Sequence, residues 1–172
     1  IVITNSVASV QPTVPTSGTW FSAVVSNDTY RTPFISFSNG MDGPAIVTVS
    51  GAVDLSGLQL PATNVAALVI DVTPPVNPTL SLTASNSSSA TVSWASYIPP
   101  ADLNAFRLYL ATSNFTSVAD RSSVTTVGAG SRSYTYYGLT LDMPYYAAVA
   151  AVDNAGNSAP AVTPLSFSLP ST

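Results

Sequence analysis

The residues that could carry out chemistry in this chain are almost entirely aspartates. The sequence contains no histidine, cysteine, lysine or glutamate, so its charge comes from four arginines and eight aspartates. The common general bases, nucleophile partners and transition-metal ligands are therefore missing. Catalysis would need two aspartates held in one cleft, as in an aspartic dyad or a two-carboxylate glycosidase. The aspartates are Asp28, Asp42, Asp54, Asp71, Asp102, Asp120, Asp142 and Asp153.

These aspartates are scattered singly, mostly in predicted turns, where Asp commonly caps its own backbone. The sequence therefore predicts a protein that is not an enzyme and holds no cofactor. Calcium is the one ion whose oxygen ligands are abundant here. Asp153, Asn154 and Asn157 share one turn, and Asp42 lies near Asn39 in another. An ordinary β-turn uses the same residue types, so calcium ligation and plain turn formation are both open interpretations.

The composition favours an all-β fold that must position these turns. Charged residues make up 7% of the chain, far below the usual share of about 25%. The strong helix formers Lys and Glu are absent, whereas strand-forming and turn-forming residues are abundant. A net charge of −4 without a run of like charges argues against nucleic acid as a partner. The longest apolar run, near residues 65–70, is strand-sized and predicts no membrane span.

A proline-rich segment, residues 71–78, divides the chain. Its three prolines exclude a helix and disfavour a central strand. The sequence therefore predicts a small β domain over residues 1–70 and a β-sandwich over residues 71–172. Strand-like blocks of the first part are residues 1–10, 19–26, 33–38, 45–50 and 65–70. Those of the second part are residues 79–83, 90–94, 106–110, 124–127, 133–137, 145–152 and 162–169.

Four local features of the second part occur in a fixed order. They are the Thr73-Pro74-Pro75 start, the strand Ala90-Thr91-Val92-Ser93-Trp94, the alternation of Phe106, Leu108 and Leu110, and Gly138-Leu139 six residues before Tyr145. With these features, residues 71–169 resemble the fibronectin type III family. The resemblance implies a fibronectin type III, immunoglobulin-like β-sandwich in which the Tyr145 hydroxyl bonds back to the backbone. The implied core residues are Trp94, Phe106, Leu108, Leu139, Tyr145 and Val149.

The low charge of the chain leads to a first hypothesis of function. Subunits with few charges can pack together without desolvating them, which suits an extracellular filament or pilus-like surface fibre made of copies of this chain. Residues 1–10 carry no charge or proline and could add as a donor strand to a neighbour's sheet. The same residues could instead form the first strand of their own domain. The candidate interface residues are Ile1, Val2, Ile3, Val7 and Val10.

Two other functions stay open. The chain could be a binding or spacer module of a secreted or cell-surface protein, touching a glycan or a protein through Trp20 and Phe21. It could also be a viral or phage fibre protein. The initial Ile1 fits removal of a leader, and the surface composition favours an extracellular location. Candidate glycosylation acceptors are Asn27, Asn86 and Asn114.

Overall fold

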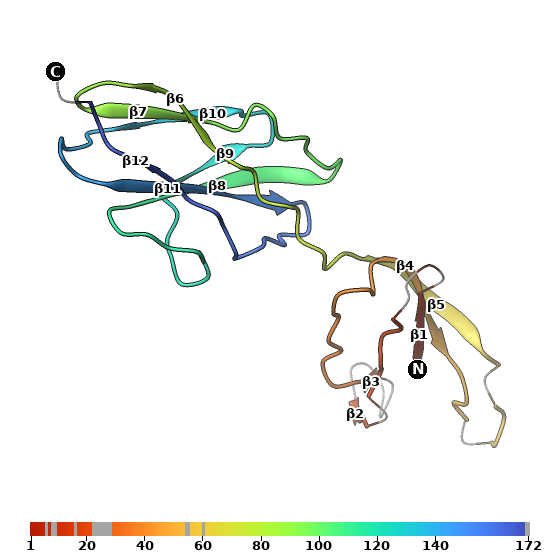
Figure 1. The fold of residues 1–172 in the computed structure, drawn as a ribbon. Coiled ribbons are helices and arrows are strands. Elements are labelled where there is room, and N and C mark those ends of the chain that lie inside the picture. The colour runs from red at the N-terminus through yellow and green to blue at the C-terminus, as the bar shows by residue number, and fades with distance from the viewer. Residues whose placement is uncertain are drawn as a thin grey trace. The chain divides into compact units, whose positions relative to one another are not determined.

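The computed structural model describes residues 1–5, 7, 10–15, 17–21, 29–53, 56–59 and 61–170. Every regular element in this part is a strand, so the all-β prediction is confirmed (Figure 1). Two compact units, residues 1–73 and 74–172, make up the chain. The division comes three residues after the predicted boundary. Over the described residues there is no helix able to cross a membrane.

The second unit is a β-sandwich of two antiparallel sheets (Figure 1). One sheet has the order β10-β7-β6 and the other β12-β11-β8-β9. Each strand block predicted for this part overlaps one of these strands. The strands are β6 (Ser81–Ser85), β7 (Ser89–Ser93), β8 (Leu103–Ala111), β9 (Thr125–Gly128), β10 (Ser133–Tyr137), β11 (Tyr145–Asp153) and β12 (Leu165–Phe167).

The core of the sandwich lies between the two sheets. Trp94 and Phe106 are fully buried, with ring centroids 5.3 Å apart in an edge-to-face arrangement. Leu108 and Val149 are also buried there, and Leu139 is partly buried against the same cluster. Each large apolar side chain buried here contributes about 1.5–3 kcal/mol.

The central strand β11 is covered on both faces. Ala147 and Ala151 face the core between the sheets, while Ala148 and Ala150 pack in a second cluster with Tyr109. Phe115, Val118 and Val162 complete that second cluster from the loops. Small residues along β11 therefore allow both layers to approach closely.

Asn77 fixes the proline-rich start of the second unit to its central strand. Its side-chain oxygen accepts the backbone N–H of Ala151 at 2.9 Å. Its side-chain nitrogen donates to the carbonyl oxygens of Ala159 at 3.0 Å and Ala161 at 2.8 Å. Because the neighbouring prolines lack N–H groups, this amide supplies hydrogen bonds that their backbone cannot.

The first unit is built on a three-stranded antiparallel sheet, ordered β1-β4-β5, and a two-stranded hairpin, β2-β3. Its buried cluster consists of Ile3, Met41, Ala45 and Ile70. These residues lie on one side of the sheet, so the unit buries a single sheet face. The strands are β1 (Val2–Asn5), β2 (Thr19–Phe21), β3 (Thr29–Arg31), β4 (Gly43–Val49) and β5 (Thr63–Ile70).

One predicted strand of the first unit is wrong. Residues 33–38 form no strand, and β3 lies instead within residues 27–32, which were expected to be a break. Pro33 has no N–H to give to a ladder. Phe34 after it is fully exposed, whereas Ile35 packs against the core of the first unit from outside any strand.

The amino-terminal strand pairs within its own chain. β1 runs antiparallel to β4, with Ile3 opposite Val47, and Ile3 joins the core of the first unit. This arrangement corresponds to the alternative of a strand in its own domain, not to donation to a neighbour. Of the expected ten-residue strand, Val2–Asn5 are in the ladder, whereas residues 6, 8 and 9 lie outside the described part of the chain. The other interface candidates, Ile1, Val2, Val7 and Val10, are exposed.

Candidate functional site

The Asp153 carboxylate, a candidate calcium ligand, stabilises the turn in which it lies. It is fully buried at the end of β11, and its two oxygens accept the backbone N–H and the side-chain amide of Asn157 at 2.8 and 2.9 Å. Gly156 takes a φ of 92°, which suits glycine and closes the turn. Asn154 donates its backbone N–H to the Asp102 carbonyl and leaves its side chain exposed. The turn thus provides its own partners for the buried charge.

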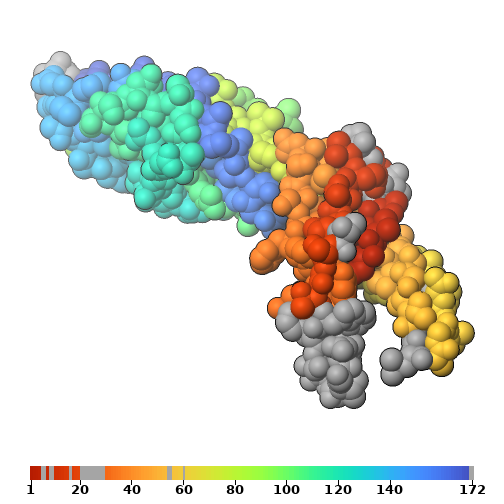
Figure 2. Space-filling view, turned by 90° about the horizontal axis from the view of Figure 1, so that it is seen from below, coloured from red at the N-terminus to blue at the C-terminus, as the bar shows by residue number. Residues whose placement is uncertain are grey.

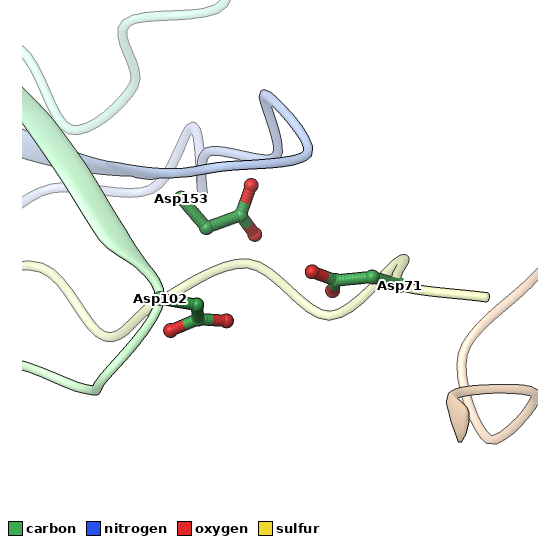
Figure 3. A group of neighbouring side chains, drawn as sticks. All are labelled: Asp71, Asp102 and Asp153. Carbon is green, nitrogen blue, oxygen red and sulfur yellow. The ribbon is translucent and has the colours of Figure 1, made fainter. Parts of the chain in front are cut away.

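Asp102 lies beside Asp153 because β8 and β11 are neighbouring strands. Their carboxylate oxygens lie within 4.8 Å of each other, and Figure 3 shows the two side chains at the start of β8 and the end of β11. Asp71, also labelled in Figure 3, belongs to the first unit. Asp102 also contributes, after burial, to raising the pKa of the Tyr97 phenol, whereas Arg132 lowers it.

The Asp42 carboxylate, a calcium candidate together with Asn39, also accepts hydrogen bonds from the backbone. One of its oxygens accepts the N–H groups of Val72 at 2.8 Å and Thr73 at 3.0 Å, and the other accepts the Thr73 hydroxyl at 2.8 Å. The Val72 N–H and the Thr73 hydroxyl hold the pKa of this carboxyl below its usual value, outweighing the effect of burial. The carboxylate therefore secures the carboxyl end of the first unit.

Two tyrosines bury their rings in the second unit and use their hydroxyl groups. Thr140 donates its backbone N–H to the Tyr145 hydroxyl at 2.8 Å, and the Tyr145 ring stacks on Phe167. The Tyr136 hydroxyl donates to the Tyr109 carbonyl at 3.1 Å, while burial and then Tyr134 raise the pKa of its phenol. These hydroxyls are engaged in structural bonds.

Two of the glycosylation candidates lie in exposed loops of the second unit. Asn86 is in the β6–β7 turn, where its side-chain oxygen accepts the N–H groups of Ser88 and Ser89. Asn114 follows β8 and accepts the N–H of Phe115. Asn27 lies outside the described residues.

A surface hollow of about 520 Å³ lies beside the β2–β3 hairpin in the first unit. Gly18 is needed there, because any side chain at this position would collide with the Tyr30 ring. Phe34 on the rim is fully exposed. Among the described residues, the hollow is lined by Ser17, Gly18, Thr19, Arg31, Thr32, Pro33 and Phe34.

The hollow combines an aromatic ring, a guanidinium group and several hydroxyls. An exposed aromatic face can stack on the C–H face of a sugar or on an apolar side chain. Sequence reasoning placed the aromatic contact at Trp20 and Phe21, whose side chains lie outside the described part. Phe34 was missed because residues 33–38 were predicted to form a strand. Pro33, which has no N–H to donate to a ladder, was a signal against that strand.

Comparisons with known proteins place the second unit. A family model described as "Fibronectin type III domain" matches residues 73–168, more than half of the chain. The structure of the chicken CNTN1 FN1-FN3 domains is similar at 16% identity and a TM-score of 0.51, covering 83% of this chain and 52% of that one. A structure described as "Myokine structure" gives 22% identity and a TM-score of 0.44, covering 58% of this chain and all of that one.

The similarity to the chicken CNTN1 structure shows the fold alone. The chain spans about half the length of the chicken CNTN1 structure, and the low identity makes that likeness one of architecture. No match occurs among curated proteins. The family match covers all seven strands of the second unit, from the proline-rich start to β12. With the buried Trp94 and the backbone bond to Tyr145, it leads to one conclusion: the chain belongs to the fibronectin type III family.

Proposed function

We propose that this chain is a non-enzymatic contact and spacer module of an extracellular or cell-surface protein. The fibronectin type III unit is the spacer, and the first unit makes the contact, with a glycan as its partner. The observation that carries this proposal is the hollow beside the β2–β3 hairpin, with the fully exposed Phe34 at its rim.

The lack of catalytic side chains supports a non-enzymatic role. Without His, Cys, Lys or Glu, an acid–base pair would have to be made of aspartates. Asp102 and Asp153 lie near each other in the second unit, and both oxygens of Asp153 accept hydrogen bonds from Asn157. Fibronectin type III domains generally serve as structural or binding modules, which agrees with this chemistry.

The hollow offers what a sugar ring requires. Phe34 presents a fully exposed aromatic surface on which a sugar ring could stack. The hydroxyls of Ser17, Thr19 and Thr32 line the same hollow and can bond sugar hydroxyls. Arg31, one of the four arginines of the chain, also lines the hollow and favours a sugar that carries a carboxylate.

A glycan array probed with the full chain tests the proposal. We expect binding to uronic-acid or sialic-acid glycans, and a loss of about tenfold or more in affinity for Phe34→Ala and Arg31→Gln. Arg107→Gln, an exposed arginine on β8 in the other unit, is the matched control and should bind like the wild type. Binding that is equal in all variants, or no glycan binding by the wild type, would contradict the proposal.

A subunit of a surface fibre is the second candidate. The chain carries few charges, and the sheet of the first unit is not closed, with β1 at one edge and β5 at the other. The donor-strand route is disfavoured, because β1 already pairs with β4. Electron microscopy of the native material at neutral pH would reveal a fibre, whereas dispersed particles would favour the contact module.

A further inference from the structure

β5 is an edge strand whose outer side has no partner strand in the described chain. The sheet order β1-β4-β5 leaves its outer backbone groups without a ladder. β5 is drawn in yellow at the rim of the first unit in Figure 1, and yellow atoms of this part of the chain reach the surface in Figure 2. Such a row of N–H and C=O groups is a template on which another extended strand can pair along its length.

The length of β5 sets it apart from the other sheet edges. It has eight residues, whereas the edge strands β1, β6, β9, β10 and β12 have four, five, four, five and three. Proteins usually protect edges by keeping them short or by placing charges or proline on them. β5 contains neither a charged residue nor proline, and most of its residues are exposed.

The sequence of β5 is close to a palindrome. Val65-Ala66-Ala67-Leu68-Val69 has similar residues at equal distances on either side of Ala67. An antiparallel copy centred on Ala67 would place Val65 opposite Val69, Ala66 opposite Leu68, and Ala67 opposite itself. Val65 and Val69 are 56% and 77% exposed, so this pairing would cover apolar surface as well as backbone.

We infer that β5 is a self-association edge that pairs antiparallel with β5 of a second copy of this chain. The two copies are related by a two-fold axis at Ala67, which joins their sheets into one. The near-palindromic sequence of β5 favours a second copy as the partner, and the absence of charge on β5 lets chains that each carry −4 meet here without like charges on the paired strands. The two-fold axis closes the pair as a dimer.

This inference does not depend on the glycan contact, since a fibre subunit or a spacer could use the same edge. The β4–β5 ladder is regular from Ala66 to Ile70, so the centre of the proposed interface is ordinary flat sheet. The ladder irregularity leaves Val65 without an opposite residue in β4, at the end of the proposed pairing.

A charge exchange at Ala67 tests the inference with the full chain. Sedimentation of the wild type should show a monomer–dimer equilibrium. Ala67→Lys and Ala67→Glu, each placing like charges opposite one another, should weaken the dimer by about tenfold or more. An equimolar mixture of the two variants should restore it as a heterodimer. Thr4→Lys, an exposed position on β1, is the matched control and should dimerise like the wild type.

A cysteine at the axis gives an independent readout. The chain has no cysteine, so Ala67→Cys should form a disulfide-linked dimer on mild oxidation and Thr4→Cys should not. A wild type that sediments as a monomer at its highest soluble concentration would overturn the inference. A dimer unaffected by both Ala67 charges, or one equally weakened by Thr4→Lys, would overturn it as well.

Discussion

β11 and β5 have similar sequences and opposite surroundings. β11 contains Ala147-Ala148-Val149-Ala150-Ala151, and β5 contains Val65-Ala66-Ala67-Leu68-Val69. The β11 residues are buried on both faces between β8 and β12, whereas most of β5 is exposed at an edge. The composition of a segment therefore indicates that it forms a strand. How much of that strand is buried depends on its place in the sheet and on the layers that cover its faces.

The two units differ in the same way. The fibronectin type III unit encloses its core between two sheets and uses buried polar groups such as Asp153 and Tyr136 inside it. In the described part of the first unit, the buried cluster covers one face of the three-stranded sheet. A domain with one thin core has little stability to spare, so its exposed strand and hollow are the natural places for contacts with other molecules.

The same substitution in the two strands should have the largest effect. Ala151→Lys puts an unpaired charge into the fully buried core and should lower the free energy of unfolding of the second unit by about 3–5 kcal/mol. Ala67→Lys should leave the stability of both units within about 0.5 kcal/mol, because Ala67 is exposed. Urea denaturation followed by circular dichroism measures both. Similar losses in the two variants would break the comparison between β11 and β5.

Sequence reasoning is most direct where a side chain has a single structural role. Phe106 and Leu108 alternate at strand spacing, as do Val92 and Trp94, and all four side chains are fully buried. It failed at residues 33–38, where the apolar residues Phe34 and Ile35 suggest a strand but Pro33 removes a donor and Phe34 faces solvent.

Other features depend on partners that are distant in the sequence. Asn77 and Ala151 are 74 residues apart, and no local pattern shows that a single amide joins the start of the unit to its central strand. The residues lining the hollow likewise come together only through the pairing of β2 with β3. Calcium at Asp153, Asn154 and Asn157 stays a prediction, since turn formation explains the same residues.

Removing the Tyr145 hydroxyl tests one buried polar contact of the fibronectin type III unit. Tyr145→Phe keeps the ring stacked on Phe167 but removes the acceptor of the Thr140 N–H. The second unit should lose about 1 kcal/mol of unfolding free energy. Tyr137→Phe is the matched control, because Tyr137 is 79% exposed and its loss should change nothing measurable. Equal stability of the two variants in urea would show that the Tyr145 bond contributes no net stability.

The smallest effect on stability should come from Asp42, whose carboxylate binds the carboxyl end of the first unit. Its pKa is lower in the folded chain than in the unfolded one because its carboxylate accepts the Val72 N–H and the Thr73 hydroxyl. Its contribution to stability is therefore present above the ordinary value of 3.8 and is lost as pH falls through the lower folded pKa. Asp42 is only partly buried, so the stability change should be small.

The amide protons of Val72 and Thr73 report this titration directly. Their chemical shifts should move together with an apparent pKa below 3.8, and their hydrogen exchange should accelerate in Asp42→Ala. In the same variant, exchange at the Ala151 amide, which is bonded to Asn77 in the other unit, should stay slow. If exchange at the Ala151 amide accelerated equally, the two units would unfold together. The contrast between the two units would then fail.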